Sequence, residues 1–204
     1  MKVKICGITN LEDAKLSYDL GANAIGFIFY QKSKRYIEPK EAKEIINQLP
    51  VFLLRVGVFV NESVKEINKI ARDIKLNLIQ LHGEEPPEMI DDIELPVIKA
   101  FRVTENFDYS IVSEYKNCSF LLDAYNKNEY GGTGQKFNWR KIPSELKGKI
   151  ILAGGVSENN VEQIYKDVNP CAVDVSSSIE IKPGKKDHKK LKQLFQKIYE
   201  LRKA

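Results

Sequence analysis

The feature that most constrains the fold of this 204-residue chain is an alternation between short apolar runs and helix-like segments. Most of the runs are continuous rather than strictly alternating, which is typical of parallel strands buried on both faces. Between them, apolar residues mostly stand three and four positions apart, which predicts amphipathic helices. Eight such strands are expected, at Val3–Ile8, Ala24–Phe29, Leu53–Val60, Leu78–His82, Pro96–Phe101, Ser119–Ala124, Lys149–Ala153 and Ala172–Ser176.

Several side chains mark the expected starts of helices. Thr9 and Glu12 have the spacing of a capping box, in which each side chain bonds the backbone N–H of the other residue. Ser63 and Ser157 each precede a helical pattern, so both are expected to act as N-caps.

Eight strand–helix units predict an α/β protein with a single (β/α)8 TIM barrel over residues 1–204. A degenerate helical segment is expected after the sixth strand, with only a short helix around Trp139–Leu146, and a short extra helix is expected after the eighth strand. A doubly wound open sheet is the alternative. Nucleotide binders of that type more often carry G-x-G-x-x-G after the first strand, whereas this first strand ends in CGIT, so the barrel is favoured.

Composition argues against several classes of partner. The net charge of +4 is mild, and the basic stretch KKDHKKLKQLFQK at residues 185–197 has helical spacing, which indicates a solvated helix face rather than a nucleic-acid patch. No apolar run approaches the roughly 18 residues that span a membrane. No signal peptide is expected, because the first residues run directly into a strand-like pattern, and the odd number of cysteines includes no CxxC pair. We therefore expect free thiols, a cytoplasmic location and neither a nucleic-acid nor a membrane partner.

Glycines indicate which end of the barrel carries the chemistry. Active sites of (β/α)8 barrels lie at the carboxyl ends of the strands, and glycine lets backbone approach a ligand closely. Of the twelve glycines, eight lie at these strand ends or in the loops that follow, namely Gly7, Gly83, Gly131, Gly132, Gly134, Gly154, Gly155 and Gly184.

The three cysteines fall into two groups according to the end of the strand at which they lie. Cys118 and Cys171 precede their strands, so they are expected to be small structural hydrophobes at the opposite end. Cys6 lies near the end of the first strand, where position alone leaves a buried thiol and a functional thiol equally open. A metal site is not expected, because metal binding needs several ligands and the rim offers only His82 as a second soft ligand beside Cys6.

Four more polar residues at the same rim are candidates for a site. Asp123 ends an apolar strand, where a carboxylate is costly unless it is paired or exposed, so a function is favoured over a salt bridge. Asp174 either forms a structural hydrogen bond inside the barrel, which we favour, or contacts a substrate hydroxyl. Arg35 either belongs to a surface basic cluster or grips a carboxylate or phosphate. His82 either orients a substrate or bonds a strand end.

The loops after the seventh and eighth strands predict a phosphate site. The first loop contains Gly154 and Gly155, and the second contains Ser176, Ser177 and Ser178. Small residues with free backbone N–H groups and a short helix at these two loops bind phosphate in many such barrels. The alternative is a pair of glycine turns without a ligand.

Motifs along the whole chain resemble those of the phosphoribosylanthranilate isomerases. They are, in order, KICGIT, GFIFYQKSKRYI, VGVFVN, IQLHG, LLDAY followed by GGTG, LAGGV, and DVSSSIE with PGKKD. The combination of KICGIT, QLHG and GGTG is specific. Two residues depart from the usual pattern: Ser178 stands where the family usually has glycine, and Ser157 where it often has proline.

The resemblance implies a cofactor-free Amadori rearrangement of N-(5-phosphoribosyl)anthranilate in L-tryptophan biosynthesis. It implies Asp123 as the general acid at the ring oxygen and Cys6 as the general base at C2, with Arg35 on the anthranilate carboxylate. His82 and Asp174 are implied as further substrate contacts, in a monomer or a homodimer. A free thiol has a pKa of about 8.5, so a modestly lowered pKa would make Cys6 a competent base, while Asp123 must hold a proton part of the time.

Two rivals remain. Other phosphosugar barrels are expected to use a catalytic lysine near the first loop or a pair of carboxylates, which CGIT disfavours. A barrel that binds a phosphorylated ligand without turnover is the second rival.

Overall fold

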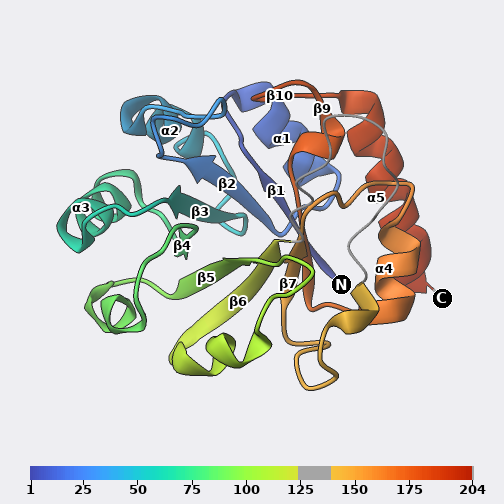
Figure 1. Cartoon of the computed structure of the whole chain (residues 1–204). Coiled ribbons are helices and arrows are strands. Elements are labelled where there is room, and N and C mark those ends of the chain that lie inside the picture. Colours follow the sequence, from blue (N-terminus) through green and yellow to red (C-terminus); the bar gives the residue numbers. More distant parts are fainter. Residues whose placement is uncertain (124–138, 204) are drawn as a thin grey trace.

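Eight parallel strands form a closed barrel in chain order, with β8 hydrogen-bonded to β1 (Figure 1). The structure is a computed structural model that describes residues 1–123 and 139–203. The strands are β1 (Lys2–Cys6), β2 (Ala24–Ile28), β3 (Leu54–Phe59), β4 (Leu78–Leu81), β5 (Val97–Arg102), β6 (Cys118–Asp123), β7 (Ile151–Ala153) and β8 (Ala172–Val175). The prediction of a (β/α)8 barrel is confirmed, and the open sheet is excluded.

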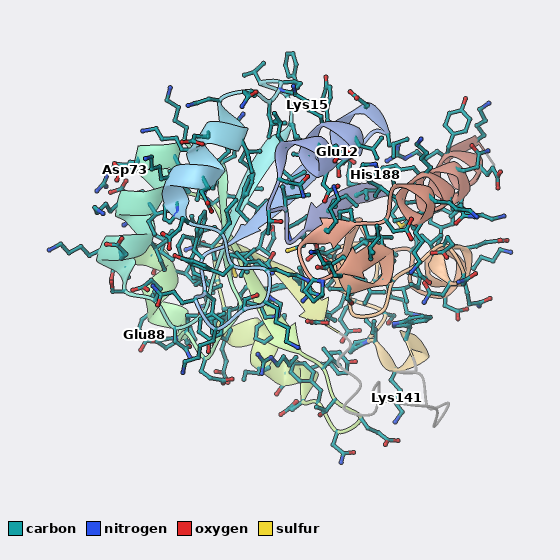
Figure 2. The ribbon with its side chains drawn as sticks, turned by 90° about the horizontal axis from the view of Figure 1, so that it is seen from above. Glu12, Lys15, Asp73, Glu88, Lys141 and His188 are labelled. Carbon is teal, nitrogen blue, oxygen red and sulfur yellow. The ribbon has the colours of Figure 1, made fainter. Side chains whose placement is uncertain are left out.

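Helices cover the outside of this barrel (Figure 1). The α-helices are α1 (Leu11–Asp19), α2 (Pro39–Ile46), α3 (Val64–Ile74), α4 (Val161–Val168) and α5 (His188–Lys203). Charged side chains such as Lys15, Asp73 and Glu88 lie on the outer face of this layer (Figure 2). Among the described residues, no helix combines the length and apolarity needed to cross a membrane.

Two of the expected amphipathic helices are 3₁₀ helices instead. The segment after β4 forms η1 (Pro87–Asp92), and the segment after β5 forms η2 (Tyr109–Glu114). Each has six residues, and η1 begins at a proline, which has no N–H to donate. Such short connections favour the tighter 3₁₀ form.

The sequence predicts a short helix after β6 and another after β8. The GGTG motif at residues 131–134 lies outside the described residues, and the short helix expected around Trp139–Leu146 is limited to η3 (Trp139–Lys141). After β8, the expected short helix is η4 (Ser177–Ile179). An antiparallel pair follows it, formed by β9 (Glu180–Lys182) and β10 (Lys185–Lys186).

Apolar side chains form two clusters on the two sides of the barrel wall. Ile5, Phe27 and Phe59 point outward and pack in a cluster that also contains helix residues. Successive side chains on a strand point to opposite faces, so the second cluster, made only of strand residues, is the barrel interior. It contains Ala24, Val56, Ile98, Ala100, Leu121 and Ala153. Many of these side chains are small, and the interior also holds the charged residues Lys4 and Asp174.

Only one of the three predicted helix starts is confirmed. The Ser63 hydroxyl accepts a hydrogen bond from the Glu66 N–H and caps α3. The capping box at Thr9 is wrong, because α1 begins at Leu11 with Asn10 as its N-cap.

The Thr9 hydroxyl instead donates to the carbonyl of Gly184, which lies in the hairpin formed by β9 and β10. This hydrogen bond links the loop after β1 to that hairpin. The cap predicted at Ser157 is also wrong, because α4 begins only at Val161. The Ser157 hydroxyl accepts from the Asn159 N–H within the preceding turn.

Replacing Ser63 with alanine removes a helix cap, so we expect Ser63→Ala to lower the free energy of unfolding by about 1 kcal/mol. Urea unfolding followed by circular dichroism measures the change. Ser63→Asn, which keeps an acceptor, is the matched control and should unfold close to the wild-type midpoint. An equal loss in Ser63→Asn and Ser63→Ala would contradict the capping role.

Candidate active site

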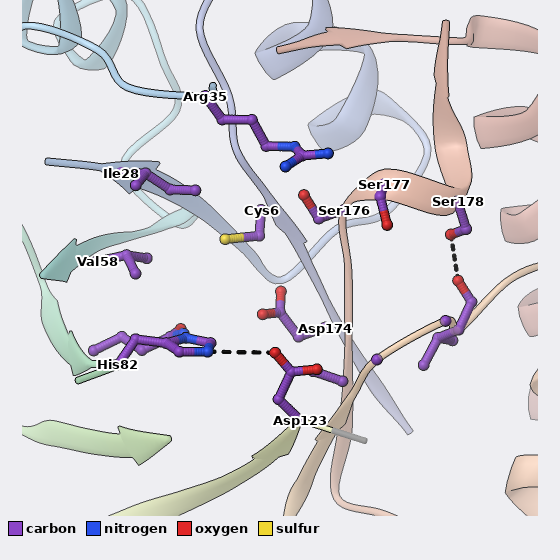
Figure 3. Close-up of a pocket in the computed structure, with 15 residues that line it drawn as sticks. Cys6, Ile28, Arg35, Val58, His82, Asp123, Asp174, Ser176, Ser177 and Ser178 are labelled. Atoms are coloured by element: carbon purple, nitrogen blue, oxygen red, sulfur yellow. Dashed lines mark hydrogen bonds and ion pairs between the residues drawn. The ribbon is translucent and has the colours of Figure 1, made fainter. Parts of the chain in front are cut away.

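A pocket of about 260 Å³ opens at the carboxyl ends of the strands. All ten residues that the sequence singled out for a site line it (Figure 3), namely Cys6, Arg35, His82, Asp123, Asp174, Gly154, Gly155, Ser176, Ser177 and Ser178. The other lining residues are Ile28, Val58, Gln80, Ala153 and Val156. Closure of the barrel therefore brings together residues from positions 6 to 178 of the chain.

Cys6 lies at the end of β1 with 6% of its surface exposed. Burial raises the pKa of this thiol, and the nearby ammonium of Lys4 opposes the rise without reversing it. The pKa of the thiol therefore stands above its ordinary value, whereas the role of a general base needs a lowered one. The cause is desolvation, which disfavours a thiolate in a buried position.

Asp174 faces the barrel interior from β8, as favoured from the sequence. Its Oδ2 accepts a hydrogen bond from Lys4 Nζ at 2.9 Å. Its Oδ1 is also buried but has no hydrogen-bond partner among the described residues. A buried acceptor without a partner is costly, so this oxygen at the pocket is suited to a ligand hydroxyl.

His82 and Asp123 lie against one another at the ends of β4 and β6 (Figure 3). The distance from His82 Nε2 to Asp123 Oδ2 is 3.3 Å. On the other side of the ring, Gln80 Nε2 lies 2.8 Å from His82 Nδ1. With the Gln80 amide donating to Nδ1, the ring proton is on Nε2 and points to the Asp123 carboxylate. Gln80 was not anticipated, because a lone glutamine inside a strand gives little signal in the sequence.

Arg35 is held in an ion cluster rather than in an exposed basic patch. Its Nε and Nη2 donate to the Glu180 carboxylate at 2.9 and 2.6 Å. Glu180 also accepts from Lys186 Nζ at 2.9 Å, and Lys186 donates to the Cys6 carbonyl at 2.6 Å. Although burial alone would raise it, Arg35 and Lys186 hold the pKa of Glu180 below its usual range.

The cluster leaves part of the Arg35 guanidinium for a ligand. None of the described residues accepts a hydrogen bond from its Nη1 nitrogen, and Arg35 lines the pocket. Gly7 makes this placement possible, because a Cβ there would lie 2.7 Å from Arg35 Cδ. Glu180 and Lys186 were not predicted as site residues, although Glu180 belongs to the motif DVSSSIE and Lys186 to PGKKD.

The two loops expected to bind phosphate lie side by side at the pocket. Gly154 and Gly155 have positive φ angles of 85° and 71°. The Ser178 hydroxyl donates to the Val156 carbonyl and so joins the loop after β7 to η4 (Figure 3). The departure at Ser178 thus adds a bond between the two loops.

Within the described ranges, no group of three or more His, Cys, Asp or Glu side chains is placed to hold a metal ion. The described residues offer a thiol, two carboxyl groups and an imidazole around one pocket, together with a guanidinium and two loops of small residues. Such a set can move protons on a bound anionic substrate.

Comparisons with known proteins identify the family of the chain. The family model described as N-(5'phosphoribosyl)anthranilate (PRA) isomerase matches residues 3–197. The chain is 46% identical over 195 residues to the N-(5'-phosphoribosyl)anthranilate isomerase of Citrifermentans bemidjiense, with 95% of each chain covered.

Solved structures give the same result. The phosphoribosyl anthranilate isomerase of Thermotoga maritima is similar with a TM-score of 0.90 and 45% identity, covering 98% of this chain and 99% of that one. A phosphoribosyl anthranilate isomerase in complex with reduced 1-(o-carboxyphenylamino)-1-deoxyribulose 5-phosphate has a TM-score of 0.87 and 41% identity, with 98% and 99% covered. The chain therefore belongs to the N-(5'-phosphoribosyl)anthranilate isomerase family.

Proposed function

We propose that this protein isomerises N-(5-phosphoribosyl)anthranilate to 1-(2-carboxyphenylamino)-1-deoxyribulose 5-phosphate in the biosynthesis of L-tryptophan, in the cytoplasm. The observation that carries the proposal is the arrangement of one pocket. Cys6 and Asp123 face it together with Arg35 and the two loops at Gly154 and Ser176. A substrate with a carboxylate at one end and a phosphate at the other matches the two anchors, and its sugar then lies near the thiol and the carboxyl group.

The first step opens the ribose ring. In our proposal, Asp123 as general acid gives a proton to the ring oxygen while the bond from C1 to that oxygen breaks. The lone pair of the anthranilate nitrogen forms a C=N bond to C1, so the product is a protonated Schiff base. The Nε2 of His82, 3.3 Å from Asp123 Oδ2, stabilises the carboxylate left behind.

The second step moves a proton from the sugar. The Cys6 thiolate takes the proton from C2, and the electron pair of that C–H bond flows into the C=N bond to give an enol amine. Tautomerisation to the C2 ketone, with a proton taken up at C1, completes the rearrangement. The substrate's own Schiff base serves as the electron sink, so the step consumes no other reagent.

The anionic ends of the substrate are proposed to bind as follows. The Nη1 side of Arg35, which Glu180 leaves unused, receives the anthranilate carboxylate. Backbone N–H groups around Gly154, Gly155 and Ser176–Ser178 receive the phosphate. The unpartnered Oδ1 of Asp174 accepts from a sugar hydroxyl.

The assembly state is proposed to be a monomer or a homodimer. Phe52 and Val51 are 90% and 73% exposed in the turn before β3, at the end of the barrel opposite the pocket. A homodimer that forms through this surface would bury these side chains, whereas in a monomer they would stay exposed. The pocket lies at the other end of the barrel and would be the same in both. Sedimentation velocity distinguishes the two.

We expect Cys6→Ala and Asp123→Asn each to lower kcat by about 10²- to 10⁴-fold, the usual contribution of a general acid or base. Turnover is followed by the change in anthranilate fluorescence with freshly made substrate. Cys118→Ser, at the opposite end of the barrel, is the matched control and should keep wild-type turnover.

Near-wild-type turnover in Cys6→Ala would end the assignment of the base. A single stoichiometric change in wild-type fluorescence, without continued turnover, would instead favour a barrel that only binds its ligand.

We expect Arg35→Ala chiefly to raise KM, by about tenfold or more, because a charge-assisted contact to the carboxylate is lost. Arg35→Lys keeps the charge but not the planar fork, so it should recover only part of the affinity. Steady-state kinetics measures both, with unfolding by urea as a check on the Glu180 cluster. An unchanged KM together with an unchanged kcat would remove Arg35 from the site.

A further inference from the structure

A buried ion pair lies inside the barrel beneath the pocket. The side chains of Lys4 and Asp174 are 5% and 8% exposed, and Lys4 Nζ lies 2.9 Å from Asp174 Oδ2. Interiors of such barrels are usually filled by branched apolar side chains. Burying two charges costs desolvation free energy that the pair alone often does not recover. The pair thus calls for a role beyond stability.

The ammonium of Lys4 lies close to the sulfur of Cys6. The two residues are two positions apart on β1, so their side chains point to the same face. Gly26 is the β2 partner of Cys6 in the strand register. A Cβ at Gly26 would lie 2.8 Å from Cys6 Sγ and 3.1 Å from Lys4 Nζ. Both atoms therefore approach one small space, which exists because residue 26 has no side chain.

We propose that Lys4 is a positioning residue for the reaction proposed above, holding its ammonium, anchored by Asp174, where it stabilises the thiolate of Cys6. The proposal rests on the proposed function for the role of Cys6 as a base. It goes beyond that function because it names the group that makes a buried thiol usable as a base.

The charges around the thiol support this role. Lys4 lies beneath it on β1, Asp174 faces it from β8, and Lys186 of β10 bonds its carbonyl. Among the described residues that line the pocket, the other charged or titratable groups are Arg35, His82 and Asp123. Lys4 has the largest opposing effect on the thiol, since it counteracts burial more than the other groups do.

Lys4 itself stays charged in this position. Burial alone would lower the pKa of Lys4, but Asp174 and Cys6 together raise it above its ordinary value. An ammonium has three donors, and Asp174 Oδ2 accepts one of them, so others remain for the sulfur. When the thiol ionises, the ammonium gains a second negative partner without having to move far.

The test measures the ionisation of Cys6 without relying on turnover. In a parent that carries Cys118→Ser and Cys171→Ser, Cys6 is the remaining thiol. The rate of its alkylation by iodoacetamide is followed against pH, because only the thiolate reacts. Lys4→Met should move the titration to higher pH by about one unit or more. Asp174→Asn should move it to lower pH, since a negative neighbour is lost.

Turnover provides a second readout. For Lys4→Met we expect kcat/KM to fall about tenfold for each pH unit by which the Cys6 titration moves upward, because less thiolate is present at a given pH. If Lys4→Met does not fold with Asp174 left unpaired, Lys4→Met with Asp174→Asn keeps the interior uncharged. This double variant should still titrate above the parent, since Lys4 has the larger effect of the two.

Lys99→Met is the matched control. Lys99 is another buried lysine, with Nζ 2.7 Å from Glu85 Oε2, but it points away from the pocket into the outer layer. Its replacement should lower stability and leave the Cys6 titration unchanged. Equal titrations in parent and Lys4→Met, or shifts of Lys4→Met and Asp174→Asn in the same direction, would overturn the proposal. Loss of the base role itself is judged separately, from turnover in Cys6→Ala.

Discussion

Hydrogen bonding between β1 and β8 is the constraint on which the rest of the structure depends. Lys2–Ile5 pair in register with Ala172–Val175, which closes the sheet into a barrel. Closure places the ends of all eight strands on one rim and brings Lys4 opposite Asp174. The base proposed at the first strand and the loops proposed to bind phosphate at the last strands therefore become neighbours, although about 170 residues of chain separate Lys4 from Asp174.

Buried charge is organised in pairs throughout this barrel. The buried lysines that the structure describes, Lys4, Lys99 and Lys186, each contact a carboxylate, from Asp174, Glu85 and Glu180 respectively. An unpaired buried charge would be far more costly than a pair, so each partner is obligatory once the other is present. The pairs at Lys4 and Lys186 both touch the surroundings of Cys6, one beneath its sulfur and one at its carbonyl. They shape the electrostatics of the pocket, whereas the Lys99 pair supports the layer outside the strands.

The sequence was informative wherever function depends on residue type at a strand end. The continuous apolar runs located the eight strands to within one or two residues, and the rim of glycines and polar residues located the pocket. It was less informative where the outcome depends on competing local geometries. Thr9 has the spacing of a capping residue, but its hydroxyl bonds Gly184 in a hairpin far along the chain. The segments after β4 and β5 have helical patterns, but their short connections close as 3₁₀ turns.

By itself, the sequence determined the fold class, the working face and the set of candidate residues, because periodicity and residue chemistry are local properties. Only the tertiary structure decided how those residues act on one another. The Cys6 thiol is harder to ionise than a free thiol because it is buried, and burial is a property of the closed barrel. Arg35 is aimed by Glu180, and Asp123 faces His82, because strands distant in sequence end at the same rim. The ammonium of Lys4 lies near Cys6 because Gly26, on the neighbouring strand, leaves the space that both atoms approach.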